Sequence, residues 1–110
     1  MINAVTVTMD LQTLDPELPG KLMLMQPLTP GSARTVPGGV MVFQAACLNS
    51  EAGEPSLYRF VIQFGAAQAV AAIGNWLFKE LYGTAAALRI GGLPVPIGHH
   101  SIIAALRRVG

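Results

Sequence analysis

Apolar and polar side chains alternate along two stretches of the chain, and a period of two is typical of β-strands. Residues 2–9 alternate and favour β-branched side chains, which predicts an opening strand. Residues 57–64 place four apolar side chains on one face: Tyr58, Phe60, Ile62 and Phe64. We expect this second stretch to be a half-buried strand. A helix that runs on into the next segment is the alternative.

Two further apolar segments carry a weaker pattern. Residues 15–20 are turn-forming, and they precede a short apolar stretch, residues 21–25, that we interpret as a strand. Prolines and glycines then punctuate residues 27–39, which predicts a loop that no helix would tolerate. Residues 40–48 are apolar on both faces except at Gln44, and this pattern fits either a central strand or a short buried helix.

Helical periodicity is clearest between residues 66 and 82. Apolar side chains recur there at helical spacing: Ala66, Ala69, Val70, Ile73, Trp76, Leu77 and Leu81. Gly83 is well placed to end this helix. Two features depart from the pattern, because Glu80 lies within the apolar face while Phe78 and Tyr82 project from the polar one.

The C-terminal third predicts a hairpin. Two apolar stretches, residues 85–90 and 93–97, flank a Gly-Gly pair, which is a two-residue hairpin signal. In the register that this turn sets, Pro94 and Pro96 take positions that form no backbone hydrogen bond to the partner strand. Only an edge strand tolerates prolines in this way.

These elements predict an α+β fold: a mostly antiparallel sheet with one long amphipathic helix and a short C-terminal helix. The short helix is expected over residues 102–109, with Ser101 as its N-cap. A length of 110 residues is near the most common domain size, so we expect a single α+β domain over residues 1–110.

Composition adds a constraint, because only 12% of the residues are charged while 52% are hydrophobic. Soluble domains usually have about 25% charged residues. A chain of this size buries only about 60–70% of the surface that its unfolded form exposes. We therefore expect surplus apolar surface that faces a second subunit, a partner protein or a lipid surface.

The charge pattern argues against two kinds of partner. The formal net charge is +1 and only Arg107 and Arg108 are adjacent basic residues, so there is no basic footprint for nucleic acid. The longest uncharged run, residues 60–78, is long enough to span a bilayer, but amides and glycines interrupt it. This argues against membrane association.

Candidate chemistry is sparse. Cys47 is the only cysteine, so no intramolecular disulfide can form. Its apolar neighbours predict that it packs as a small hydrophobic side chain. A lone cysteine, with no export signal at the N-terminus, predicts a cytoplasmic protein.

The pair His99 and His100 is the only cluster that looks chemical. Neighbouring side chains on a chain point in different directions, and no acidic residue lies nearby in sequence to complete a metal site. We predict no catalytic residue, no cofactor and no metal site. Glu80, on an apolar helix face, needs a partner, and we expect an ion pair with Arg89.

Aromatic side chains are the candidate partner interface. Exposed aromatic residues concentrate at protein–protein interfaces, so we assign Trp76, Phe78 and Tyr82 to this role. The alternative for Phe78 and Tyr82 is packing beneath a neighbouring loop.

One family likeness follows from the order of these segments. Residues 15–22 (Asp-Pro-Glu-Leu-Pro-Gly-Lys-Leu), continuing to Pro30 and Gly31, resemble the start of the effector-associated constant component proteins of bacterial conflict systems. The subsequent order is similar: an apolar helix that ends near Trp76, then a strand-turn-strand over residues 88–97, then a short helix. The resemblance implies a small non-enzymatic component encoded beside effectors, with no catalytic residue to carry over.

Our favoured hypothesis is a non-enzymatic protein-interaction or adaptor component of a bacterial defence or conflict system, which binds a protein partner or forms a homo-oligomer. A small inhibitor or immunity protein that binds a partner enzyme is one alternative, although such proteins usually carry a strong charge bias. A small enzyme that pairs Cys47 with His99 or His100 is another. A membrane-associated component is the last.

Overall fold

The computed structural model describes residues 5–24, 28–48, 53–65 and 67–109. The α+β class is confirmed, with three helices in the described part of the chain where the sequence predicted two. The elements are β1 (Val5–Thr13), α1 (Leu18–Leu22), β2 (Ala33–Val36), β3 (Gly39–Cys47), β4 (Ser56–Phe64), α2 (Ala67–Leu81), β5 (Ala85–Ile90), β6 (Leu93–Pro94) and α3 (His99–Val109).

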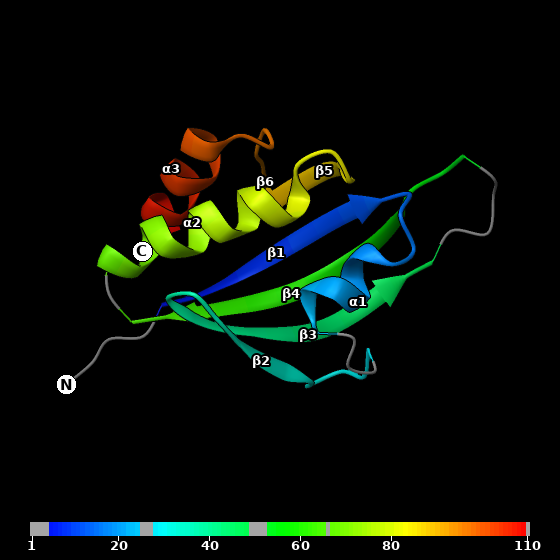
Figure 1. Ribbon diagram of the computed structural model, residues 1–110, viewed down its shortest axis with the longest axis horizontal. Helices are drawn as coiled ribbons and strands as arrows, with labels where there is room; N and C mark the ends of the chain where they lie inside the picture. Colours follow the sequence, from blue (N-terminus) through cyan, green and yellow to red (C-terminus); the bar gives the residue numbers. More distant parts are fainter. Residues whose placement is uncertain (1–4, 25–27, 49–52, 66, 110) are drawn as a thin grey trace.

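The strands form one six-stranded sheet in the order β2-β3-β4-β1-β5-β6 (Figure 1). Every pairing is antiparallel, where the sequence predicted a mostly antiparallel sheet. The first strand lies inside the sheet, between β4 and β5, and pairs Met9 with both Phe60 and Ile90. The predicted opening strand thus exists, although it continues to Thr13, and residues 2–4 lie outside the described part.

The helices all cover the same face of the sheet (Figure 1). Alternate side chains of the two central strands point into the core beneath them: Val7, Met9 and Leu11 from β1, and Tyr58, Phe60, Ile62 and Phe64 from β4. The predicted half-buried strand at residues 57–64 is therefore confirmed, with the expected residues inside.

Helix α2 packs along the middle of this core. Val70, Ile73, Leu77 and Leu81 are buried there, and Gly83, with φ of +82°, follows the helix as predicted. Gly74 faces α3, and a Cβ atom added to it would collide with the Ile103 side chain. The missing side chain allows α2 and α3 to pack closely.

The segment after the first strand corrects one expectation. Residues 21–25 are not a strand, because α1 covers Leu18–Leu22, and Met25 lies outside the described residues. Leu18 and Leu22 are one helical turn apart and both are fully covered by the core. Pro19 sits in the first turn, where its missing N–H costs nothing.

The predicted loop over residues 27–39 contains a strand. Its glycines and prolines flank β2 rather than interrupt it, and the β2–β3 turn uses Gly38 at φ of +86°. This turn packs against α2, since a Cβ on Gly38 would lie 2.8 Å from the Ala69 carbonyl oxygen. Residues 40–48, which the sequence left open between strand and helix, belong mostly to β3.

The C-terminal hairpin has the predicted register, with Ile90 opposite Leu93 and Arg89 opposite Pro94. Its second strand is an edge strand, as predicted, but it is shorter than expected and ends at Pro94. The predicted cap of the last helix is wrong. Helix α3 begins at His99, so Ser101 lies inside its first turn, and the Ile102 N–H donates to the Gly98 carbonyl oxygen.

Candidate functional site

The three predicted interface residues lie on two different flanks of α2. Trp76 and Phe78 are two positions apart, which is about 200° around a helix. Trp76 faces the side of α1 and β2, while Phe78 and Tyr82 face the start of α3. The three side chains therefore do not form one continuous surface.

Trp76 packs within the molecule. The guanidinium carbon of Arg34, on β2, lies 5.0 Å from the centre of the indole ring. Arg34 also donates from Nη1 to the Leu22 carbonyl oxygen at 3.2 Å and from Nε to the Thr35 carbonyl oxygen at 2.9 Å. The arginine thus ties β2 to the end of α1 and to α2, and it covers one side of Trp76.

Phe78 and Tyr82 belong to a row of four rings on the surface between α2 and α3. We call Tyr82, Phe78, His99 and His100 the ring row. Ring centres are 5.3 Å apart for Tyr82 and Phe78, and 5.8 Å apart for Phe78 and His99. His99 and His100 follow at 5.5 Å, with their rings nearly parallel at 17°.

Within the ring row, Phe78 is half-buried and the other three rings are exposed, with Tyr82 70% exposed. The His99 ring nitrogen Nε2 also contacts Oδ1 of Asn75 on α2. An amide oxygen only accepts, so His99 donates this hydrogen bond, which holds its ring against Phe78.

Sequence reasoning missed the ring row for a specific reason. It expected the two histidine side chains to diverge, whereas the structure stacks them at the start of α3. The missing information was that α3 begins at His99 rather than after Ser101. Helical spacing alone does not reveal which residues Phe78 contacts.

The other candidate residues are not brought together. Cys47 is exposed, which corrects the expectation that it packs as a small hydrophobic side chain. It pairs with Leu57 on the side of the sheet opposite the helices, whereas His99 belongs to the helical layer. A Cys–His pair is therefore not assembled. Within the described residues, no group of three His, Cys, Asp or Glu side chains could hold a metal ion.

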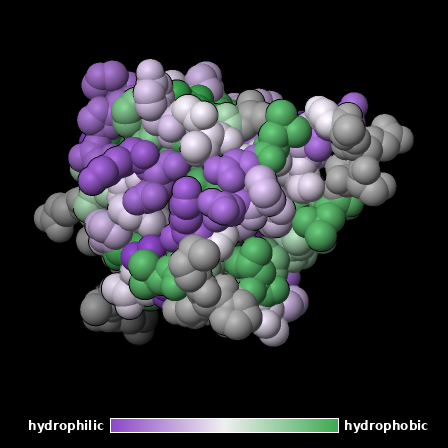
Figure 2. Space-filling model, turned by 45° about the vertical axis from the view of Figure 1, so that its right-hand side comes forward, coloured by the Kyte–Doolittle hydropathy of each residue, from purple (hydrophilic) through white to green (hydrophobic). Residues whose placement is uncertain are grey.

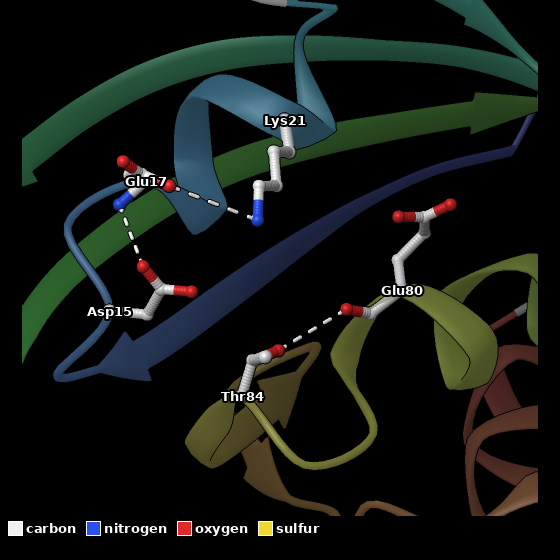
Figure 3. A network of polar contacts seen from close by, with 5 residues as sticks. All are labelled: Asp15, Glu17, Lys21, Glu80 and Thr84. Atoms are coloured by element: carbon white, nitrogen blue, oxygen red, sulfur yellow. Dashed lines mark hydrogen bonds and ion pairs between the residues drawn. The ribbon is translucent and has the colours of Figure 1, made fainter.

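The expected ion pair between Glu80 and Arg89 is also wrong. Leu88 and Ile90 point into the core, so Arg89 between them points to the opposite face of the sheet from α2. Figure 3 shows Glu80 extending from α2 over the helical face instead. Alternation along β5 would have placed Arg89 correctly.

Polar contacts surround the start of α1 and the end of α2 (Figure 3). The Glu17 N–H donates to Asp15 Oδ1 at 2.9 Å, and the Glu17 carboxylate lies 4.0 Å from the Lys21 ammonium. The Thr84 hydroxyl donates to the Glu80 carbonyl oxygen at 3.3 Å. These contacts are local and exposed, and they order the chain around the helix ends rather than form a pocket.

One ion pair joins two central strands. Arg59 binds the Asp10 carboxylate through two atoms, with Nε–Oδ1 at 2.7 Å and Nη2–Oδ2 at 3.3 Å. The hydrogen bond and the charge of Asp10 raise the pKa of Arg59 above its ordinary value. The Asp10 side chain is only 12% exposed although it lies on the side of the sheet away from the helices.

Several large apolar side chains remain in contact with solvent. Among the described residues these are Leu14, Leu24, Leu48, Tyr82 and Leu93. Figure 2 shows hydrophobic patches of this kind beside a hydrophilic area. No helix in the described part of the chain is long and apolar enough to cross a membrane.

Comparisons with protein families, with curated proteins and with solved structures found no match for this chain.

Proposed function

We propose that the protein is a non-enzymatic interaction component that recognises a protein partner through the ring row. The exposure of Tyr82 beside the half-buried Phe78 is the observation that carries this proposal. Aromatic side chains are enriched at interfaces, and burial of one contributes roughly 1.5–3 kcal/mol. Because Phe78 and the His99–Asn75 contact hold the row in place, a partner meets rings that are already ordered.

Composition and sequence order support the same assignment. The chain has few charges for its size, and large apolar side chains remain exposed on it. The order of its segments resembles the effector-associated constant component proteins, so we assign the role of adaptor in a bacterial defence or conflict system. This role needs a cytoplasmic partner and no cofactor.

Affinity capture with two matched variants tests the proposal. Tyr82→Ser removes an exposed ring of the row, and Leu93→Ser removes another exposed apolar side chain, which lies in the β5–β6 hairpin outside the row. We expect the tagged wild-type chain and Leu93→Ser to retain the same partner in near-stoichiometric amount, and Tyr82→Ser to lose it at least tenfold.

Two results would contradict this function. One is that every captured protein binds Tyr82→Ser as well as wild type. The other is a discrete hydrolytic activity that disappears when Cys47 or His99 is substituted, which would make the protein an enzyme.

A further inference from the structure

The end of β3 has a neighbouring strand on one side only. β2 pairs with β3 as far as Val42, and the next backbone hydrogen bonds join Phe43 to Ser32 and Gly31. β3 continues beyond that point, and Figure 1 shows its end extending past β2, beside β4. We call residues 44–48 the free edge. All five of these residues are exposed.

The alternation of backbone groups along β4 shows which of its residues bond to β3. In an antiparallel pair, the N–H and C=O of one residue point to the same side, and successive residues alternate. Phe43 directs these groups toward β2, so Val42 and its register partner Val61 direct theirs between β3 and β4. Arg59 and Leu57 follow Val61 at steps of two residues, and they therefore face β3 as well.

The same register shows which backbone groups of the free edge point outward. After the bulge in β3, Ala45 and Cys47 lie opposite those two β4 residues, so their N–H and C=O groups are used inside the sheet. Ala46 lies between them and Leu48 follows, so the backbone groups of these two residues point away from β4. Among the described residues, neither has a backbone partner on that outer side.

The side chains of the free edge favour the addition of a strand. Edge strands usually carry charged residues or prolines that prevent pairing, and residues 39–48 contain neither. Ala45, Ala46 and Cys47 are small, so a second backbone can approach closely. Leu48 is 71% exposed. An added strand would satisfy the outward backbone groups and cover this leucine, which is the usual way in which a sheet edge binds an extended segment.

We propose that the free edges of two copies of this chain pair with each other, antiparallel, about a two-fold axis at Cys47. Ala46 of each copy then pairs with Leu48 of the other, so the outward backbone groups of both residues find partners. Cys47 lies opposite the second copy's Cys47 in a pair without hydrogen bonds, in which the two Cα atoms are about 4.5 Å apart.

A second copy fits the free edge better than a foreign strand. An antiparallel pairing of one segment with itself is symmetric, as a two-fold interface requires. The free edge also carries no charge by which it could select a strand of different sequence. The pairing is short, so we expect a dimer weaker than one with an interface of standard size. The inference goes beyond the proposed function, since the ring row on α2 and α3 takes no part in it.

Oxidative cross-linking of the native cysteine tests the register. Copper phenanthroline joins cysteines whose Cα atoms lie within about 7 Å, and a non-reducing gel then shows the dimer. We expect the wild-type chain to form it readily. The double variant Ala45→Cys/Cys47→Ser moves the thiol two residues along the same exposed strand. In the proposed register the two new thiols are about 14 Å apart, so this variant should cross-link at least tenfold more slowly.

Molar mass by light scattering, over a hundredfold range of concentration, tests the pairing without oxidation. Ala46→Pro removes the outward N–H and leaves the bonds to β4 intact, so it should raise the dimer dissociation constant at least tenfold. Ala46→Lys places a charge at the same position and should act likewise if the proline variant proves unfolded by circular dichroism. Ala104→Lys, at an exposed position of α3, is the matched control and should dimerise as the wild type does.

Three results would overturn the proposal. One is a wild-type monomer at every concentration. Another is a dimer that neither substitution of Ala46 weakens. The third is equal cross-linking of thiols at positions 45 and 47, which is expected of random collisions. Tyr82→Ser should dimerise as the wild type does, so a failure of the ring row and a failure of the free edge give different results.

Discussion

The Arg34 guanidinium lies over the indole ring of Trp76, 5.0 Å from its centre, and donates to the carbonyl oxygen of Leu22 at the end of α1. One side chain thus joins an edge strand to two helices. A cation over an aromatic face contributes about 0.5–1 kcal/mol at an exposed site, and more where water is excluded.

Arg34→Ala should lower the free energy of unfolding by about 1–2 kcal/mol, because it removes the contact with Trp76 and two hydrogen bonds. Urea unfolding followed by the fluorescence of the single tryptophan measures this loss. Arg89→Ala, at an exposed position, is the matched control and should change stability by less than about 0.5 kcal/mol. Equal effects of the two substitutions would show that Arg34 ties nothing together.

Gly74→Ala should destabilise the protein by about 1 kcal/mol, although the same change inside an ordinary helix stabilises it by about that amount. The reason is the collision of the new methyl group with Ile103 on α3. In an Ile103→Ala background the collision is absent, so Gly74→Ala should become stabilising there. Thermal unfolding of the four proteins gives the coupling between the two positions, and additive effects would contradict the close helix contact.

Cys47 should react with a thiol reagent such as DTNB in the folded protein, because its side chain is exposed at the end of β3. One equivalent of thiol per chain is expected without denaturant. Urea should then raise the rate only a few-fold. A thiol that reacts only after unfolding would show that Cys47 is covered in the folded protein.

Arg59→Gln should lower stability, because it breaks the two-atom contact with Asp10. Asp10 raises the pKa of Arg59, so the contribution of this arginine is fully present below the pKa of an unfolded arginine and is lost only as the pH rises through the still higher pKa of the folded state. Titration of the arginine therefore has no effect between pH 6 and pH 9. We expect Arg59→Gln to lower the free energy of unfolding by the same amount throughout this range. A loss that fades by pH 9 would contradict the assignment.

The sequence predicted the elements whose pattern extends over several periods. Alternation in β4 identified its buried face, and the glycine at position 83 follows α2 as expected. The Gly-Gly turn set the hairpin register that places Pro94 at the sheet edge. In each case local geometry and burial favour the same structure, and a single sequence is then sufficient.

The features that the sequence did not predict depend on tertiary contacts, which cannot be read from a single sequence. Helix α1 has only five residues, so Leu18 and Leu22 provide one repeat and no periodicity. The ring row requires α3 to start beside Phe78, and that position depends on how closely α2 and α3 pack. The wrong pairing of Glu80 with Arg89 came from closeness in sequence, although the two lie on opposite faces.

The margins of the sheet limit how this protein can grow into larger assemblies. At one margin the two-residue β6 ends in Pro94, and at the other β2 has only four residues. Short or proline-bearing edges resist the addition of further strands, which is the route to fibres. Addition of strands at these margins is therefore disfavoured, and the apolar composition of the chain need not lead to polymerisation.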